Sequence, residues 1–189
     1  MDVNAPRDYD DRMSAETTGP RPTTGPGLGF DPIERARQQW VEQGWESAAD
    51  GMAAVTSLMR AHQIVLARVE ASLRPLGLTF ARYEVLMLLW FSKRGSLPMK
   101  IIGSRLQVHP TSVTNAVDRL EDAGLVNRST HPDDRRAYLV ELTSSGRELV
   151  ERATKALNTE VFEQPVLSPR DQRTLVGVLT RLRHSAGDF

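Results

Sequence analysis

Residues 110–120 combine an apolar stripe with side chains that can hydrogen-bond to another molecule. The apolar positions recur at helical spacing, at Val113, Ala116, Val117 and Leu120. The other face of such a helix carries Thr111, Ser112, Thr114, Asn115, Asp118 and Arg119. Hydroxyls near the helix start can reach phosphates or bases, an asparagine amide can pair with adenine, and an arginine suits guanine or phosphate. These residue types also favour helix starts, so a merely capped and solvated helix fits this segment equally well.

A second group of charged residues lies in the loop around residues 130–136. Arg135 and Arg136 follow Asp133 and Asp134 at the tip of a predicted hairpin. An arginine at such a tip can enter the narrow, electronegative minor groove of DNA, and a carboxylate two residues earlier could hold it in place. Taken alone, the hairpin fits a solvated turn as well, because turns need polar residues.

Helical periodicity predicts the elements before these groups. Apolar residues from Trp40 to Leu73 recur at threes and fours, and Gly44 and Gly51 interrupt them. We therefore expect a short helix, then a long one from about Met52. Further helices are expected from the N-cap Thr79 to Gly95, from a first-turn Pro98 through Leu106, and from His109-Pro110 to Gly124.

Two short strands, residues 126–129 and 137–142, should follow. Thr143 or Ser145 would cap the next helix, with Ser145 and Glu148 at the spacing of a capping box. Pro165 and Ser168-Pro169 should separate it from a last helix that ends beyond Leu182. Two short helices followed by a hairpin are the layout of a winged helix-turn-helix, so the predicted fold is mainly α with a small β-hairpin.

Composition limits the class of protein. Among 189 residues there are 24 basic and 24 acidic side chains and no cysteine, which excludes disulfides, thiol catalysis and zinc-finger cysteines. Residues 1–31 are rich in proline and glycine, and we expect them to form a disordered tail. No apolar run approaches the roughly 18 residues of a membrane span, and the start lacks the pattern of a secretory signal. A cytoplasmic protein without membrane contact is expected.

Signatures of catalysis are absent from the sequence. The four histidines, at 62, 109, 131 and 184, show no metal-binding helical spacing, and no glycine-rich phosphate loop or nucleophile elbow occurs. Ser129, His131 and Asp133 have the residue types of a triad, but they crowd one loop and could not form a buried relay. We expect no enzyme activity, cofactor or metal.

The hairpin region resembles the wing signature of the MarR family of winged helix-turn-helix regulators. Leu125-Val126-Asn127-Arg128 opens it, Asp134-Arg135-Arg136 forms its tip, and Leu139 to Thr143 with Gly146 closes it. The similarity runs from about Met52 to Leu182. It implies that Pro110 to Arg119 is the recognition helix, that Arg136 enters the minor groove and that Asp134 orients Arg136.

The resemblance also implies an organisation and a function. The folded domain would span 32–189, with a winged core at about 79–143 embedded between dimerisation helices at about 34–75 and 144–185. Such a homodimer would bind a pseudo-palindromic operator on double-stranded DNA, as a ligand-responsive repressor, repression being the family's commoner mode. The alternative is a winged-helix module that binds protein, or binds DNA without sequence preference.

Three departures from the family pattern concern capping and the effector. His109 stands where a serine caps the helix in many members. The added segment with Trp40 and Trp45 is similar to the urate-responsive branch, in which Glu84 could supply the acidic group; Phe91 stands where an arginine is expected, so urate is not assigned. Family effectors are small and often aromatic or anionic, and the candidates here are Trp40, Trp45, Arg60, His62, Tyr83 and Trp90. Aromatic residues at helical spacing more commonly form core or dimer interface.

Overall fold

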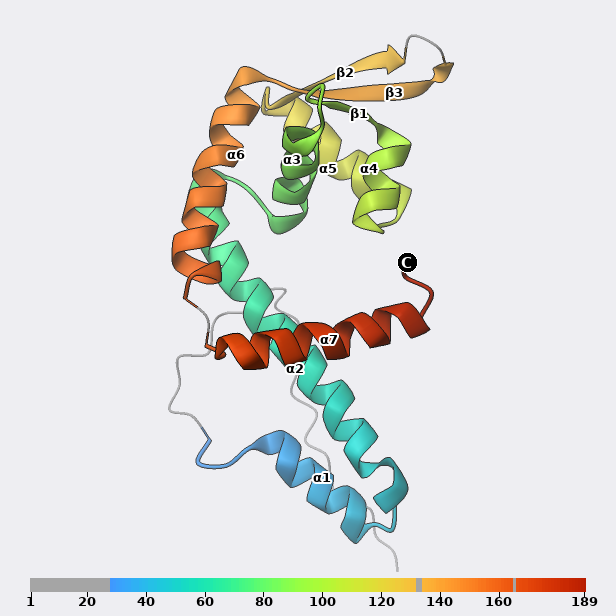
Figure 1. Cartoon of the computed structure of the whole chain (residues 1–189), viewed down its shortest axis with the longest axis vertical. Coiled ribbons are helices and arrows are strands. Elements are labelled where there is room, and N and C mark those ends of the chain that lie inside the picture. The colour runs from blue at the N-terminus through green and yellow to red at the C-terminus, as the bar shows by residue number, and fades with distance from the viewer. Residues whose placement is uncertain (1–27, 132–133, 165) are drawn as a thin grey trace, which may run out of the picture. The chain divides into compact units, whose positions relative to one another are not determined.

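The computed structural model describes residues 28–131, 134–164 and 166–189 (Figure 1). Most of the expected tail, residues 1–27, therefore lies outside the described residues. The chain divides into two compact units, Met1–Ala53 and Ala54–Phe189. No helix within the described ranges is long and apolar enough to cross a membrane.

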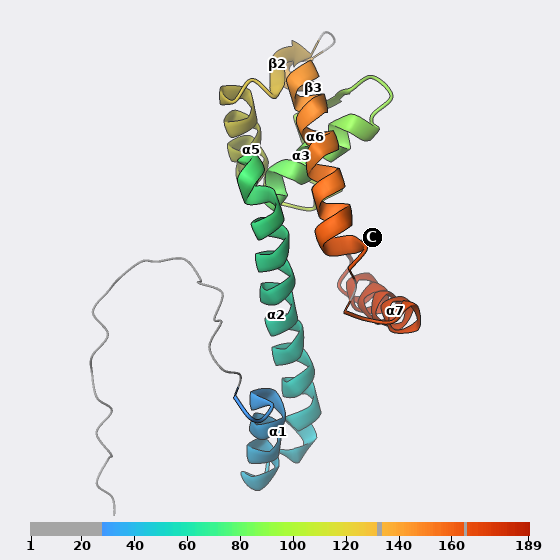
Figure 2. The same ribbon diagram turned by 90° about the vertical axis from the view of Figure 1, so that its left-hand side faces the viewer.

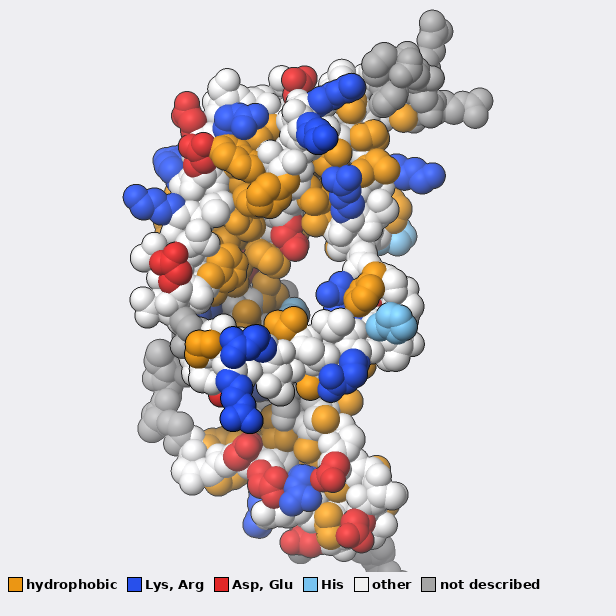
Figure 3. Space-filling view, in the orientation of Figure 1, with side chains coloured by type: hydrophobic (Ala, Val, Ile, Leu, Met, Phe, Trp, Pro, Cys, Tyr) orange, Lys and Arg blue, Asp and Glu red, His pale blue; other side chains and the backbone are white. Residues whose placement is uncertain are grey.

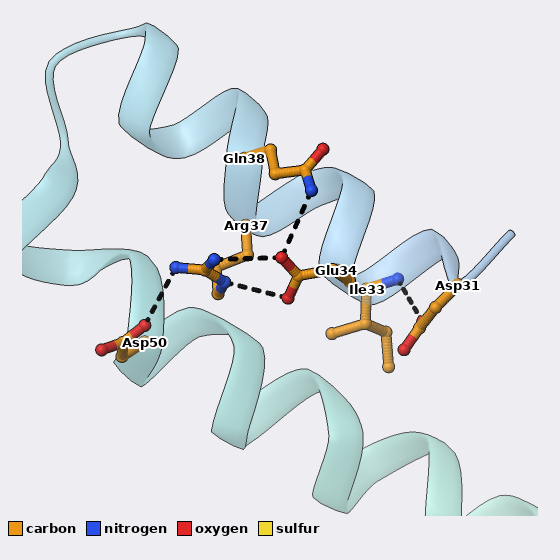
Figure 4. A network of polar contacts seen from close by, with 6 residues as sticks. All are labelled: Asp31, Ile33, Glu34, Arg37, Gln38 and Asp50. Carbon is orange, nitrogen blue, oxygen red and sulfur yellow. Dashed lines mark hydrogen bonds and ion pairs between the residues drawn. The ribbon is translucent and has the colours of Figure 1, made fainter.

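The N-terminal unit contains α1 (Pro32–Glu42) and the first turns of α2 (Glu46–Leu73). Asp31 caps α1 by accepting a hydrogen bond from the Ile33 N–H at 2.9 Å. Arg37 lies between two carboxylates, with Nε 2.9 Å from Glu34 Oε2 and Nη1 3.4 Å from Asp50 Oδ1 (Figure 4). These contacts join α1 to the beginning of α2.

The expected start of the long helix at about Met52 is wrong. The helix begins at Glu46 and continues through Gly51. Figure 2 shows α2 as one continuous helix. Of the two glycines expected to interrupt the pattern, Gly44, with φ of 81°, adopts a left-handed backbone and separates the two helices, whereas Gly51 does not. One interior glycine costs about 1 kcal/mol, which a helix of this length can absorb.

In the C-terminal unit three helices pack on one side of a small sheet (Figure 1). The helices are α3 (Phe80–Phe91), α4 (Met99–Leu106) and α5 (Pro110–Asp122). The antiparallel sheet has the order β1-β3-β2, formed by β1 (Ser96–Pro98), β2 (Val126–His131) and β3 (Asp134–Leu142). The mainly α fold with a winged helix-turn-helix is confirmed.

Strand β1 was not predicted. Pro98 ends this strand and is the N-cap of α4 rather than a first-turn residue. Helix α3 ends at Phe91, and Gly95, with φ of 65°, lies in the turn that follows instead of closing the helix. A strand of three residues has no measurable periodicity, and β3, its partner, is about forty residues away along the chain. Only the tertiary fold brings the two together.

Both strands of the wing are longer than expected. The register pairs Val126 with Leu142 and Arg128 with Val140, and an irregularity lies between Thr130 and His131. The predicted strands stopped where the alternation of apolar and polar residues ended, but the backbone pairing extends further, to Thr130 with Tyr138 and His131 with Asp134.

Thr143 caps α6 (Ser144–Leu157), accepting a hydrogen bond from the Gly146 N–H at 3.0 Å. The predicted capping box of Ser145 and Glu148 is therefore wrong. A π-helical turn (Asn158–Phe162) follows α6, and Ser168 caps α7 (Pro169–Ser185). The 3-10 turn Arg74–Leu76 ends α2.

A single apolar core holds the C-terminal unit together. Its most completely buried side chains come from α2, α3, α4, α5, the sheet and α6, and include Leu73, Leu86, Leu89, Ile102, Val117, Leu120, Val126, Val140, Val150 and Leu157. By contrast, α7 contributes no buried residue, and it exposes Leu175, Val176, Val178 and Leu182. The middle of α2 likewise exposes Val55, Leu58, Met59, Ile64 and Val65. Apolar surface of this extent commonly marks an interface.

Gly146 should tolerate no side chain. A Cβ there would lie 2.1 Å from Leu125 O and 2.8 Å from Leu142 Cδ1. We expect Gly146→Ala to lower the free energy of unfolding by about 1–3 kcal/mol, because the backbone of Leu125 would have to move. Gly177 on α7, whose nearest such neighbour is Arg181 Nη1 at 3.9 Å, is the matched control. Gly177→Ala should be neutral or stabilise by about 0.5–1 kcal/mol. Chemical denaturation measures the free energy of unfolding of both variants and of the unaltered protein. If Gly146→Ala were as stable as Gly177→Ala, the close packing described for Gly146 would be contradicted.

Candidate nucleic-acid interface

Helix α5 has one buried and one exposed face. Val113, Val117 and Leu120 are 2 %, 0 % and 1 % exposed, and Ala116 is partly buried. The opposite face is exposed and carries the predicted contact residues Pro110, Thr111, Ser112, Thr114, Asn115 and Arg119. The predicted division between apolar and polar positions is therefore present in the structure. The apolar face fixes which side chains α5 presents outward.

The start of α5 is capped by a histidine. His109 Nδ1 accepts a hydrogen bond from the Thr111 N–H at 3.3 Å, and Pro110 occupies the first turn. The Thr114 hydroxyl donates to Pro110 O at 3.0 Å. The side chains of Ser112, Asn115 and Arg119 make no hydrogen bond with a described residue, which leaves their polar atoms available.

Arg128 joins the wing to α5, a role that the sequence analysis missed. Its side chain is only 19 % exposed and forms ion pairs with Asp118 and with Glu121, whose Oε2 lies 3.4 Å from Arg128 Nε. The Arg128 N–H also donates to Glu121 Oε1 at 3.2 Å. Its guanidinium carbon lies 5.8 Å from the centre of the Tyr138 ring on β3.

These contacts set the position of β2 relative to the last turns of α5. Asp118 lies on the exposed face, as expected, but its carboxylate binds Arg128 within the protein. A signal was present in the sequence, since two acidic residues one helical turn apart precede an arginine of the wing signature.

The wing tip contains the other predicted contact residues. Asp134, Arg135 and Arg136 form the beginning of β3, and the register places Asp134 opposite His131. Their side chains lie outside the described part of the structure. The role of Arg136 in the minor groove, with Asp134 as its partner, therefore stays a prediction.

The six predicted effector residues fall in different places. Trp40 and Trp45 belong to the N-terminal unit, where their rings meet edge to face with centres 5.4 Å apart. Arg60 and His62 are exposed on α2. Tyr83 is buried, with its hydroxyl 3.1 Å from Thr154 Oγ1. Trp90 is partly buried, with the Arg147 guanidinium carbon 4.9 Å from its ring centre. Tyr83 and Trp90 thus both contact α6, whereas the other four residues lie elsewhere.

A groove of about 430 Å³ lies beside these two residues. Figure 3 shows apolar side chains gathered between α3 and α6 on this face. The groove is lined by Met87, Trp90, Phe91, Val150, Glu151, Thr154, Lys155, Asn158, Thr159 and Glu163. Phe91 is 74 % exposed, an unusual position for a large aromatic side chain. The sequence analysis did not find the α6 and π-turn residues, because nothing in their spacing relates them to α3.

Glu84, the acidic residue considered for a urate site, does not line this groove. It is half-buried on α3, and its burial raises the pKa of its carboxyl. The structure therefore adds no support for urate.

Sequence and structure comparisons agree on one family. A MarR family model matches residues 78–138. The chain is 36 % identical over 124 residues to the HTH-type transcriptional regulator YhbI of Bacillus subtilis (strain 168), covering 64 % of this chain and 79 % of YhbI.

Two solved structures from Streptomyces coelicolor have the same fold. Sco5413, a MarR family transcriptional regulator, is 50 % identical with a TM-score of 0.68, covering 74 % of this chain and 97 % of Sco5413. Sco3205, solved in complex with DNA, is 25 % identical with a TM-score of 0.65, covering 72 % of this chain and 88 % of Sco3205. With the winged helix-turn-helix and the amphipathic α5 described above, these similarities show that the chain belongs to the MarR family of DNA-binding transcriptional regulators.

Proposed function

We propose that this protein is a ligand-responsive repressor that binds a pseudo-palindromic operator as a homodimer, with α5 in the major groove and Arg136 in the minor groove. The observation that carries the proposal is the exposed polar face of α5, opposite a stripe that is almost completely buried. A helix held in this way can enter the major groove without losing its packing.

The predicted contact residues of α5 each have a DNA contact suited to their chemistry. Asn115 and Arg119, whose polar atoms are unoccupied among the described residues, would read adenine and guanine. Thr111 and Ser112, beside Pro110, lie in the first turn, where their hydroxyls and the positive end of the helix dipole favour a phosphate. The Thr114 hydroxyl is bound to Pro110 O, so its methyl group is left for a thymine methyl.

The wing would make the second contact with DNA. Arg136, oriented by Asp134, would enter the minor groove, and Arg135 would bind a phosphate. The ion pairs of Arg128 support this arrangement, because they tie β2 to α5 and so fix the wing at one angle to the recognition helix.

A second copy of the chain would cover the exposed apolar residues of α2 and α7. A symmetric dimer places two recognition helices about 34 Å apart, one turn of DNA, so each reads one half of a palindrome. Occupancy of such an operator would block transcription.

Loss of a base-reading side chain should relax specificity. We expect Asn115→Ala or Arg119→Ala to lower the preference for the correct base by about 1–3 kcal/mol of binding free energy at one position of each half-site. Base preference at the other positions should not change. Arg152→Ala, an exposed arginine on α6, is the control and should change nothing. Selection from a random duplex library, followed by titration at two salt concentrations, measures both effects. Equal loss on all sequences would favour a non-specific binder, and no salt dependence would favour a protein-binding module.

Removing the link between wing and α5 should also weaken binding, although Arg128 itself contacts no DNA in this proposal. We expect Arg128→Gln to lower operator affinity roughly tenfold, because the wing and α5 would no longer be held at one angle. The slope of affinity against salt should stay the same, since the number of phosphate contacts is unchanged. Thermal unfolding of the free variant serves as the control for folding. A reduced salt slope would show instead that Arg128 binds phosphate.

The groove between α3 and α6 is the proposed effector site. An aromatic ligand could lie against Trp90 and Phe91, while Lys155 and Asn158 offer partners for an anionic or polar group. Beside the groove, Arg68 of α2 donates to Glu160 O at 2.6 Å, so the π-turn is joined to α2. A ligand that shifts α3 against α6 would thereby change the spacing of the recognition helices.

Aromatic acids and their neutral amides test this site as a matched pair of probes. We expect an aromatic acid to raise the melting temperature of the free protein and to lower its operator affinity. Phe91→Ala should weaken both effects, and Lys155→Ala should weaken binding of the acid but not of the amide. A thermal-shift assay measures the melting temperature, and titration with operator DNA measures the affinity. Responses that persist undiminished in both variants would place the effector elsewhere.

A further inference from the structure

Three basic side chains gather where the turn after α3 meets the start of α6. The turn Ser92–Gly95 is closed by a hydrogen bond from its last N–H to its first carbonyl oxygen at 3.1 Å. Lys93 and Arg94, its two central residues, are exposed. Arg147 of α6 lies beside them, because a Cβ built on Gly95 would lie 3.5 Å from Arg147 Nη2. We call Lys93, Arg94 and Arg147 the basic cluster.

The turn that carries two of these residues is fixed at both ends. Gly95 has φ of 65°, a conformation that favours glycine, and its carbonyl oxygen accepts a hydrogen bond from the Leu142 N–H at 2.9 Å. At the other end, the Ser92 hydroxyl donates to Leu89 O at 2.9 Å. The side chains of Lys93 and Arg94 therefore start from a backbone that is held in place.

Arg147 is oriented by an aromatic ring. Its guanidinium carbon lies 4.9 Å from the centre of the Trp90 ring. Glu151 is one turn further along α6, a spacing at which opposite charges commonly pair, yet it forms no ion pair with Arg147. Stacking on a ring leaves the N–H groups at the edge of a guanidinium available to donate.

The cluster has no anionic partner among the described residues, where none of its three side chains forms an ion pair. Besides Glu151, the nearby carboxylate is Glu141, which the strand register places opposite Ser96. Three cations thus exceed two carboxylates that do not bind them. A phosphate group suits this surplus, because it carries up to two negative charges and offers several oxygens to an arginine fork.

The wing separates the cluster from the proposed DNA contacts. Strand β3 has nine residues, Asp134–Leu142, so its two ends are about 26 Å apart. The cluster adjoins the Leu142 end, whereas the predicted minor-groove contact is at the Asp134 end. A phosphate bound by the cluster would therefore not belong to the operator.

The groove between α3 and α6 adjoins the cluster. Trp90 lines the groove, and the same ring lies under the Arg147 guanidinium. Phe91, which is 74 % exposed, also lines the groove and directly precedes the turn Ser92–Gly95. A ligand whose ring lies against Phe91 therefore has the cluster within reach of a phosphate on the same molecule.

We propose that the basic cluster binds a phosphate group of the effector, so that the effector carries a phosphate in addition to its aromatic ring. This inference rests on the proposed effector groove and names the class of ligand that the groove takes. Arg147 would bind two phosphate oxygens, while Lys93 and Arg94 would neutralise the remaining charge. Phosphate esters of aromatic compounds and nucleotides have this chemistry.

Phenyl phosphate, benzoate and benzamide test the cluster on the full chain. Phenyl phosphate should bind about tenfold more tightly than benzoate, and inorganic phosphate should displace phenyl phosphate but not benzamide. Lys93→Gln with Arg94→Gln should weaken binding of phenyl phosphate about 10- to 100-fold and leave binding of benzamide unchanged. Arg147→Gln should weaken binding of phenyl phosphate to a similar extent. Ligand-observed nuclear magnetic resonance measures the dissociation constants, and circular dichroism confirms that each variant is folded. The exposed Arg152→Gln on α6 is the control and should change none of them.

Titration with operator DNA distinguishes the two sources of phosphate. If the cluster binds a small molecule, Lys93→Gln with Arg94→Gln keeps the slope of operator affinity against salt. A slope reduced by about one for each basic residue lost would show that the cluster binds the DNA backbone instead.

Two further results would overturn the inference. If phenyl phosphate binds no more tightly than benzoate, or binds the cluster variants as well as the unaltered protein, the cluster holds no phosphate. The proposed effector groove still stands in that case, provided that benzamide binds. If none of the three aromatic compounds binds, the proposed groove fails as well.

Discussion

Packing of the α5 stripe against the core is the constraint on which the candidate interface depends. Val113, Val117 and Leu120 are anchored among α3, α4 and the sheet, so the helix cannot rotate without exposing them. Their burial also decides which side chains point outward. A change that loosened this packing would alter the presented face of α5 before any DNA contact was lost.

The position of the wing depends on a second set of contacts, which join it to α5. Arg128 links β2 to the carboxylates at the end of α5, and the Thr143 hydroxyl donates to Gly124 O and Leu125 O between α5 and β2. Gly146 lets α6 approach Leu125 closely enough for that turn to form. Helix α5, the wing and α6 are therefore positioned by one small region.

The remaining surfaces are explained best by a partner. Helices α2 and α7 expose apolar residues that a single chain does not cover, and α1 has no buried residue. In the proposed homodimer, a second copy would supply the apolar cover. The groove between α3 and α6 adjoins the residues that join α6 to α2, so ligand binding and subunit arrangement would be coupled through the same elements.

The sequence by itself determined the helices, the two faces of α5 and the family resemblance, because periodicity and local capping depend on neighbours a few residues away. It did not determine β1, the start of α2 at Glu46, the role of Arg128 or the α6 side of the groove. Each of these depends on residues distant in the chain: β1 exists only beside β3, and Arg128 is partly buried against Asp118, Glu121 and Tyr138. Only the tertiary structure decided these features, because long-range packing and pairing leave no local pattern in the sequence.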